Sequence, residues 1–265
     1  MGTLYLDDIL DDHRVAAATD DRSLDELIVQ AKEMSPPRGF VAALRAQPDL
    51  GVIAEVKRRS PSKGDLNLGL DPAEISAAYE AGGAACCSVL TDEKYFGGSV
   101  ADLHAVRAAV DVPILRKDFT VSAHDVVDAR LMGADCLLLI VAALSDGELA
   151  EFHELATDLG LDVLIEVHDE DEAERAMALN GALVGVNQRD LRTFEVDTER
   201  AKRVAASLPA DVVRVAESGI GGPGDIPELV GAGFQAVLVG ESLVKHSGPA
   251  EGVACLLYTS DAADE

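Results

Sequence analysis

From residue 51 onward the sequence repeats one unit, which consists of a short apolar run, a polar loop and an Ala- and Leu-rich segment with helical spacing. Eight apolar runs can be counted, at residues 52–57, 85–90, 112–115, 136–141, 163–167, 183–186, 212–216 and 236–239. Near-continuous apolar strands that alternate with helices indicate a parallel sheet buried on both faces. Eight such units within about 250 residues predict an α/β fold, the (β/α)8 TIM barrel.

The segments between the apolar runs carry helix signals. Asp71-Pro72 and Ser145-Asp146 are typical of helix starts, because a short polar side chain caps the first turn. Glycines fall where a helix would end before the next strand, and we expect them to act as C-terminal caps: Gly82-Gly83, Gly133, Gly160, Gly181 and Gly233.

Residues 1–50 precede the repeat and show an acidic, helical pattern. Ser23 and Glu26 have the spacing of a capping box, which predicts that a helix begins there. A second short helical pattern runs from Gly39 to Gln47. We therefore divide the chain into a helical extension packed on the barrel (1–50), the barrel domain (51–257) and an acidic tail (258–265).

One short motif favours a different fold. Residues 219–224 satisfy the dinucleotide-binding pattern G-x-G-x-x-G directly after an apolar run. The match falls at the seventh strand, so only one strand is left and no complete mononucleotide-binding half can follow it. We therefore favour the barrel over an open, doubly wound sheet.

The charge balance limits the classes of partner. Asp and Glu number 48 against 22 Lys and Arg, which gives a formal net charge of -26. Such a chain disfavours non-specific binding to nucleic acid or to anionic membranes, so we expect neither as a partner. An acidic chain with few aromatic residues also resembles proteins of high-salt cytoplasms, where salt screens self-repulsion. A fold that is unchanged in low salt would contradict this halophilic hypothesis.

The cysteines and the apolar pattern bear on location. Cys86, Cys87, Cys136 and Cys255 lack the spacing of a zinc site, and three of them lie in apolar runs, where free Cys packs as a small hydrophobe. No apolar stretch reaches the roughly 18 residues of a membrane span, and the first residues lack the order of a signal peptide. We expect a cytoplasmic protein without a metal, either monomeric or weakly homo-oligomeric.

Functional groups collect at the ends of the apolar runs, where a barrel places its active site. These residues are Lys57, Thr91, Lys117, Glu166, Asn187, Glu217-Ser218 and Glu241-Ser242. Glu55 lies two residues before Lys57, so both side chains point to the same face of the first strand. The alternative for this pair is an incidental ion pair on a solvent-facing edge strand.

Basic residues follow the first, third and sixth strands of an otherwise acidic chain, and this arrangement suggests an anionic substrate. They are Lys57, Arg58, Arg59, Lys63, Arg116, Lys117, Arg189 and Arg192. The loops 218–222 and 240–242 carry glycines and hydroxyls where barrels commonly bind phosphate through backbone N–H groups. The alternative is that these glycines only form tight turns.

Seven segments together resemble the signature sequences of the indole-3-glycerol phosphate synthase family. They cover residues 54–62, 90–99, 115–119, 165–167, 185–191, 216–220 and 239–243. The resemblance extends from the N-terminal helix to about Leu257. The family usually has Asn-Asn or Asn-Ser where this chain has Asn187-Gln188, which leaves the role of Gln188 open.

The resemblance implies a reaction of tryptophan biosynthesis, in which 1-(2-carboxyphenylamino)-1-deoxyribulose 5-phosphate closes to indole-3-glycerol phosphate and loses carbon dioxide and water, with no cofactor and no metal. It implies Lys117 as general acid and Glu166 as the base that takes a proton as water leaves. Lys57 would hold the substrate carboxylate or act as acid in the dehydration, with Glu55 setting its charge and orientation. The two lysine roles are interchangeable at this point. We expect desolvation and neighbouring cations to lower a lysine pKa toward the working pH.

The resemblance also implies the residues that hold the substrate. Asn187 and Ser218, grouped with the catalytic residues, would orient polar groups together with Arg189 and Glu217, while Phe96 and Phe119 would line an apolar pocket for the aromatic ring. The implied phosphate site consists of Ser60, Gly219, Gly240, Glu241 and Ser242. We expect the Glu241 side chain to turn away from the phosphate, and we expect His168 to be solvated.

Two other functions remain open on these grounds. Another phosphate-binding barrel isomerase or synthase would share the last two loops without needing Lys57, Lys117 and Glu166 together. A non-catalytic barrel could bind phosphorylated ligands as a sensor or scaffold, because a fold alone does not fix a function. All three hypotheses predict a small, phosphorylated, anionic ligand as partner.

Overall fold

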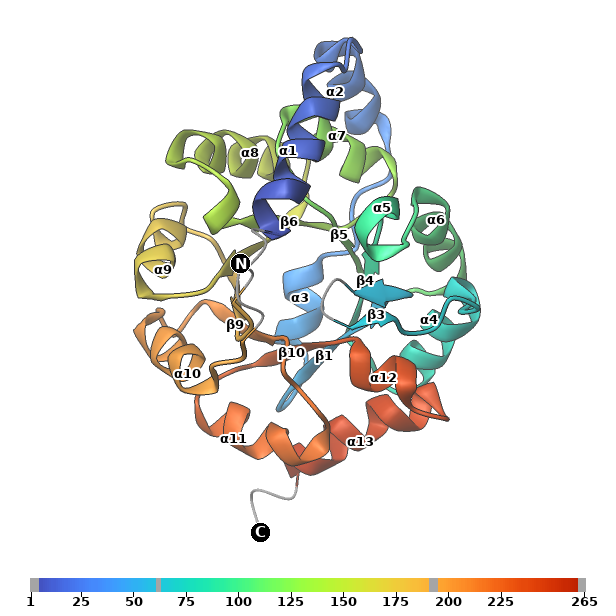
Figure 1. Cartoon of the computed structure of the whole chain (residues 1–265), viewed down its shortest axis with the longest axis vertical. Helices are drawn as coiled ribbons and strands as arrows, with labels where there is room; N and C mark the ends of the chain where they lie inside the picture. Colours follow the sequence, from blue (N-terminus) through green and yellow to red (C-terminus); the bar gives the residue numbers. More distant parts are fainter. Residues whose placement is uncertain (1–4, 61–62, 191–194, 262–265) are drawn as a thin grey trace.

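The computed structural model describes residues 5–60, 63–190 and 195–261. Of the residues singled out above, Pro61, Ser62, Leu191, Arg192 and the last four residues of the tail lie outside this part. Eight parallel strands close into a barrel, which confirms the predicted fold (Figure 1). They are β1 (Gly51–Val56), β4 (Cys86–Leu90), β5 (Ile114–Lys117), β6 (Cys136–Ile140), β7 (Asp162–Val167), β8 (Leu183–Asn187), β9 (Val213–Glu217) and β10 (Ala236–Val239).

Each strand pairs with its neighbours in chain order, and β10 closes the barrel by pairing with β1, for example Ile53 with Leu238. In the loop after β1, β2 (Arg59–Ser60) and β3 (Gly64–Asp65) form a short antiparallel hairpin. The motif at residues 219–224 therefore lies in the loop after the seventh barrel strand, and the fold is not the open, doubly wound sheet that the motif favoured.

Helices surround the strands, as the repeat predicts (Figure 1). The larger ones are α4 (Pro72–Ala81), α6 (Val100–Ala109), α7 (Ala123–Leu131), α8 (Asp146–Asp158), α9 (Glu170–Met177), α10 (Thr198–Ser207), α11 (Ile226–Gly231) and α13 (Pro249–Asp261). Shorter turns lie in the loops: α5 (Glu93–Phe96), η1 (Val141–Ala143), η2 (Pro223–Asp225) and α12 (Glu241–Lys245). The predicted starts of α4 and α8 are confirmed, because the side chains of Asp71 and Ser145 accept hydrogen bonds from the first turns.

The glycine caps follow the prediction with one exception. Gly83, Gly133, Gly160 and Gly233 have positive φ, which L-residues rarely adopt. Gly181 does not, and the left-handed position is taken by the preceding residue, Asn180, with φ 54°. Asn tolerates this conformation better than most residues. Gly181 has a different use, because a Cβ there would overlap the side chain of Ile165.

The N-terminal extension packs on both ends of the barrel. It contains α1 (Tyr5–Ala18), α2 (Leu24–Glu33) and α3 (Phe40–Arg45), and α2 begins at the predicted cap, Ser23. Phe40, Val41 and Leu44 of α3 are buried in one apolar cluster with residues of the barrel interior, at the amino ends of the strands. Leu6 and Ile9 of α1 reach the opposite end and line the pocket there.

At the other end of the chain, α13 continues past Leu257 to Asp261, so the helix includes the first part of the segment assigned to the tail. In the described part of the chain, no helix has the length and apolar character needed to span a membrane.

Candidate active site

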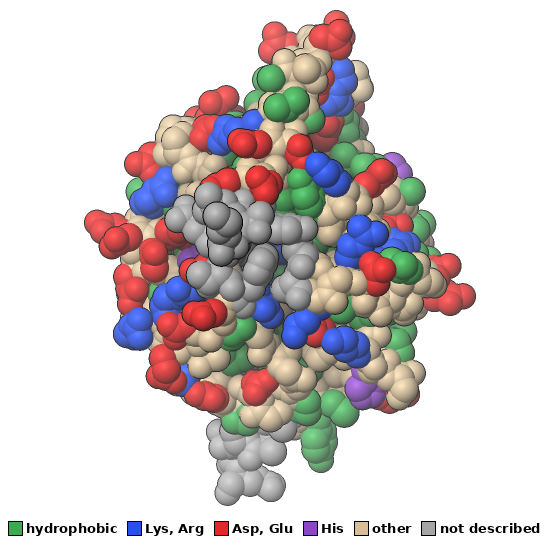
Figure 2. All heavy atoms as spheres, in the orientation of Figure 1, with side chains coloured by type: hydrophobic (Ala, Val, Ile, Leu, Met, Phe, Trp, Pro, Cys, Tyr) green, Lys and Arg blue, Asp and Glu red, His purple; other side chains and the backbone are tan. Residues whose placement is uncertain are grey.

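A pocket of about 530 Å³ opens at the carboxyl ends of the strands. It brings together all fifteen residues that the sequence analysis assigned to the site: Glu55, Lys57, Ser60, Phe96, Lys117, Phe119, Glu166, Asn187, Arg189, Glu217, Ser218, Gly219, Gly240, Glu241 and Ser242. Figure 2 shows Lys and Arg side chains both near the middle of this face and at its edge, interspersed with Asp and Glu side chains. The pocket lining carries both signs of charge: its basic residues are Lys57, Lys63, Lys117, Arg189 and Lys245, and its acidic residues are Glu55, Asp92, Asp118, Glu166, Glu217 and Glu241.

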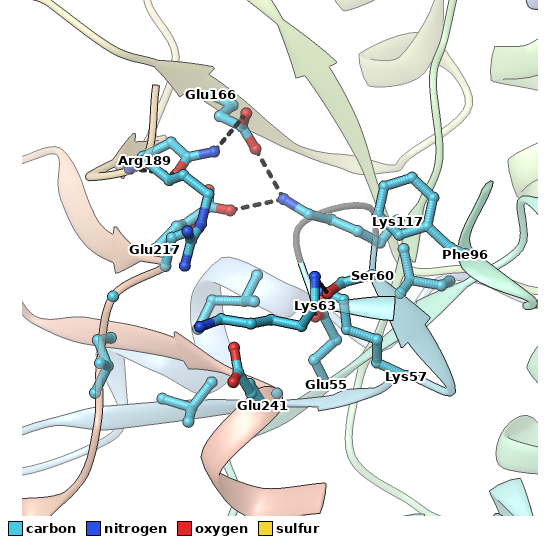
Figure 3. A pocket seen from close by; sticks show the side chains of 18 of the residues that line it. Glu55, Lys57, Ser60, Lys63, Phe96, Lys117, Glu166, Arg189, Glu217 and Glu241 are labelled. Carbon is cyan, nitrogen blue, oxygen red and sulfur yellow. Dashed lines mark hydrogen bonds and ion pairs between the residues drawn. The ribbon is translucent and has the colours of Figure 1, made fainter. Parts of the chain in front are cut away.

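The centre of the pocket is an ion cluster of three residues from three strands. Lys117, at the end of β5, donates from Nζ to Glu166 Oε2 of β7 at 2.8 Å and to Glu217 Oε2 of β9 at 2.6 Å (Figure 3). Both carboxylates are only 2% exposed. Burial alone would lower the pKa of Lys117, but the two carboxylates outweigh it and raise the pKa. The expected lowering is therefore wrong, because anions and not cations surround this amine.

The two carboxylates differ although both contact the same amine. Burial and the charge of Glu166 raise the pKa of Glu217 to about 7. Glu166 is also buried, but Lys117, His168 and a hydrogen bond from Asn187 Nδ2 at 3.1 Å lower its pKa. By contrast, Glu217 Oε1 has no hydrogen-bond partner among the described residues. Two neighbouring carboxyls with separated proton affinities are a common basis for acid–base chemistry.

Glu55 and Lys57 pair on the first strand, as their spacing predicts. Lys57 Nζ lies 2.8 Å from Glu55 Oε1, and the Glu55 side chain is buried inside the mouth of a closed barrel. The edge-strand interpretation is therefore wrong. A Cβ at Gly240 would lie 2.7 Å from Glu55 Oε1, so the absence of a side chain there leaves room for the pair.

An aromatic wall lines one side of the pocket. The ring centroids of Phe96 and Phe119 lie 6.3 Å apart, and Lys57 Nζ lies 5.8 Å from the centroid of Phe96. Leu6 and Ile9 extend this apolar surface from α1. Sequence reasoning missed these two residues, because an amphipathic helix pattern does not say which part of a barrel the helix covers.

The predicted phosphate end is formed by the loops after β9 and β10. Ser218 and Gly219 both have positive φ, at 62° and 70°. Gln188 is buried and donates from Nε2 to the Ser218 carbonyl at 2.8 Å, which gives this residue a structural role in that turn. Ser242 Oγ is buried without a hydrogen-bond partner among the described residues, so it is available to a ligand.

Two details of this end differ from the expectation. Glu241 does not turn away: its carboxylate accepts a hydrogen bond from Lys245 at 2.6 Å, and it points toward Lys63 in Figure 3. The hydrogen bond from Lys245, together with the charges of Lys63 and Arg189, lowers its pKa. The N–H groups of Gly221 and Gly222 are already bonded to Asp225, so they are not free donors for a phosphate.

The expectation that His168 is solvated is wrong. Its side chain is 8% exposed and lies beside two glutamates, Glu166 and Glu172. The sequence carried a signal for this position, because His168 follows directly on a buried strand and Glu172 lies one helical turn beyond it.

Three potential metal-ligating side chains also meet beside the pocket: His13, Asp92 and Asp118. His13 Nε2 lies 3.1 Å from Asp92 Oδ2, while the other Asp92 oxygen accepts backbone N–H groups of α5. Asp118 accepts from Thr91, Arg116 and its neighbouring backbone N–H. These hydrogen bonds account for the cluster, and the one between His13 and Asp92 links α1 to the barrel.

Comparison with known proteins identifies the family. The family model for indole-3-glycerol phosphate synthase matches residues 6–256. A Nocardioides protein named indole-3-glycerol phosphate synthase is 54% identical, with 92% of this chain and 94% of the relative covered. Indole-3-glycerol phosphate synthase 1 of Streptomyces coelicolor is 51% identical, with 97% and 96% covered.

Solved structures support the fold alone. A thiamine phosphate pyrophosphorylase from Pyrococcus furiosus superposes with a TM-score of 0.62 at 16% identity, covering 81% of this chain and 96% of that one. The family model and the curated relatives go further: the chain belongs to the indole-3-glycerol phosphate synthase family, whose members are carboxy-lyases of tryptophan biosynthesis.

Proposed function

We propose that the cluster of Lys117, Glu166 and Glu217 performs the proton transfers of the indole-3-glycerol phosphate synthase reaction in this chain. The observation that carries the proposal is the single amine hydrogen-bonded to two buried carboxylates inside a pocket of substrate size. The chain belongs to a family of enzymes, and this disfavours the alternative that it is a non-catalytic sensor or scaffold.

In the first step, the ring carbon that bears the carboxylate attacks the substrate ketone, and Lys117 protonates the ketone oxygen. The raised pKa keeps Lys117 charged before the reaction. An oxygen that acquires alkoxide character is basic enough to take a proton from a charged ammonium group. Loss of carbon dioxide then restores the aromatic ring.

In the second step, the new hydroxyl leaves as water and Glu166 takes the proton that is lost. A Lys117 that has given up its proton no longer lowers the pKa of Glu166, so Glu166 becomes a stronger base at the stage where a base is needed. We assign the protonation of the leaving hydroxyl to Lys57, which Glu55 orients through an ion pair at 2.8 Å. Each such acid or base contributes on the order of 10²–10⁴-fold in rate.

The remaining lining residues are proposed to hold the substrate. Phe96 and Phe119 would contact its aromatic ring, Asn187 and Arg189 its polar groups, and Ser242 its phosphate. Ser60, Gly219, Gly240 and Lys63 would complete the phosphate end. A cytoplasmic location, the oligomeric state and a dependence on high salt stay predictions.

The proposal is tested by mixing the protein with 1-(2-carboxyphenylamino)-1-deoxyribulose 5-phosphate at high and low salt and following indole fluorescence. We expect product from wild type and a loss of about 10²-fold or more in Lys117→Ala. Folded wild-type protein that gives no indole signal would contradict the function, whereas an active Lys117→Ala would contradict only the role of Lys117.

A further inference from the structure

Behind the proposed base lies a histidine that is held in a fixed orientation. His168 follows β7 directly, and its backbone N–H donates to Glu172 Oε2 of α9 at 2.8 Å. The ring Nδ1 lies 3.0 Å from the same oxygen. Because Glu172 accepts both hydrogen bonds, Nδ1 carries a proton. The imidazole therefore becomes charged or neutral by gaining or losing a proton at Nε2.

The free ring nitrogen faces Glu166. His168 Nε2 lies 3.7 Å from Glu166 Oε1 and has no hydrogen-bond partner among the described residues. Asn187 and Lys117 contact the same carboxylate from other directions. Glu166 is one of the described residues that line the pocket, and His168 is not. The histidine therefore lies behind the carboxylate, on the side away from the pocket.

We propose that His168 is a positioning residue that, held by Glu172, sets the proton affinity of Glu166. This rests on the proposed role of Glu166 as the base. When His168 is charged, its Nε2–H faces the carboxylate and favours the ionised form. When His168 is neutral, a lone pair faces the carboxylate and this support is lost.

The charges around His168 favour its cationic form. Glu172 of α9, Glu166 of β7 and Glu217 of β9 raise its pKa against the effect of burial, and the nearest cation in this network, Lys117 of β5, acts through Glu166. A charged His168 therefore keeps Glu166 ionised, and ready to accept a proton, down to a lower pH than Lys117 and Asn187 alone would allow.

A purely structural role must be distinguished from this one, since the hydrogen bonds to Glu172 also fix the start of α9. We would measure kcat and KM against pH for wild type, His168→Gln and Glu172→Gln. The acidic limb of kcat should move to higher pH by about one unit in His168→Gln and in the same direction in Glu172→Gln. On the plateau, kcat and KM should stay close to wild type.

Glu170→Gln is the matched control, because Glu170 lies on the same helix but pairs with Arg203. It should leave the limb in place. A kcat that falls equally at every pH, or an acidic limb that stays in place in both His168→Gln and Glu172→Gln, would overturn the inference. An inactive wild type would instead overturn the proposed function.

A second measurement does not depend on activity. If His168 and Glu166 interact, each must affect the proton affinity of the other by the same amount. Imidazole NMR titration should therefore give a lower pKa for His168 in Glu166→Gln than in wild type. An unchanged pKa in folded Glu166→Gln would overturn the inference even if His168→Gln and Glu172→Gln failed to fold.

Discussion

The two ends of the barrel interior are built by the same strands but have opposite chemistry. On β7, Leu164 is fully buried among apolar side chains, and Glu166, two residues later, belongs to the ion cluster. On β5, Leu115 and Lys117 are related in the same way. On each of these strands, the apolar side chain of the barrel interior and the charged side chain of the ion cluster are therefore only two residues apart. The apolar half keeps water from one side of the charges, which strengthens their interactions.

The largest expected effect is at the charged end. Replacing Lys117 with Met keeps much of the side-chain volume but removes the proton donor, and it takes away the amine that both Glu166 and Glu217 contact. We expect kcat/KM to fall by about 10²–10⁴-fold. Indole fluorescence gives the rate and circular dichroism checks the fold. Activity within tenfold of wild type would contradict the role.

The apolar end should respond in the opposite way. Leu164→Ala leaves a cavity in the barrel interior and should reduce the free energy of unfolding by about 2–5 kcal/mol. Activity per folded molecule should remain within a few-fold of wild type. Urea unfolding and the fluorescence assay measure the two quantities. If the variant were as inactive as Lys117→Met while still folded, the separation between the two ends would be wrong.

Gly185 of β8 lies between the apolar end and the charged end of the barrel interior. A substitution there affects side chains of both ends. A Cβ there would overlap the Glu217 carboxylate and approach Leu164 Cδ1 to 3.2 Å. Gly185→Ala should displace Glu217 from Lys117 and reduce kcat/KM by about tenfold. Gly147→Ala is the matched control, since nothing surrounds a Cβ at that position on α8, and it should match wild type. Equal activities of the two variants would contradict the prediction.

The smallest expected effect is a change of stability with pH. The folded protein holds a proton on Glu217, whose pKa is about 7, whereas the unfolded chain releases it near 4.5. The stability from that proton is complete below pH 4.5 and is lost as pH rises through 7. Glu217→Gln cannot ionise, so its Tm relative to wild type should increase by a few degrees over this range. A Tm difference that stays constant with pH, measured by calorimetry, would contradict the pKa.

The residues at the strand ends could be predicted because strand periodicity fixes which side chains point inward, and parallel strands all end at the same mouth. This reasoning located the cluster of Lys117, Glu166 and Glu217 and the pair of Glu55 and Lys57. It depends only on positions along each strand.

Properties that depend on neighbours from other segments could not be predicted. The burial of His168 depends on how α9 packs beside β7, and the raised pKa of Lys117 depends on two carboxylates from strands far away in sequence. The contribution of Leu6 and Ile9 to the pocket depends on where α1 docks. Asn180 took the left-handed position predicted for Gly181, because two adjacent residues can each supply that conformation.

The packing of α3 against the amino end of the barrel bears on whether the barrel can fold without the N-terminal extension. Phe40 is fully buried and Leu44 is nearly so, and both belong to the same apolar cluster as Ile53 and Leu115. We therefore expect residues 51–257 to need this extension in order to fold, although their repeats look self-contained in the sequence. The extension forms the floor of the barrel, and we expect both parts to unfold in one cooperative transition.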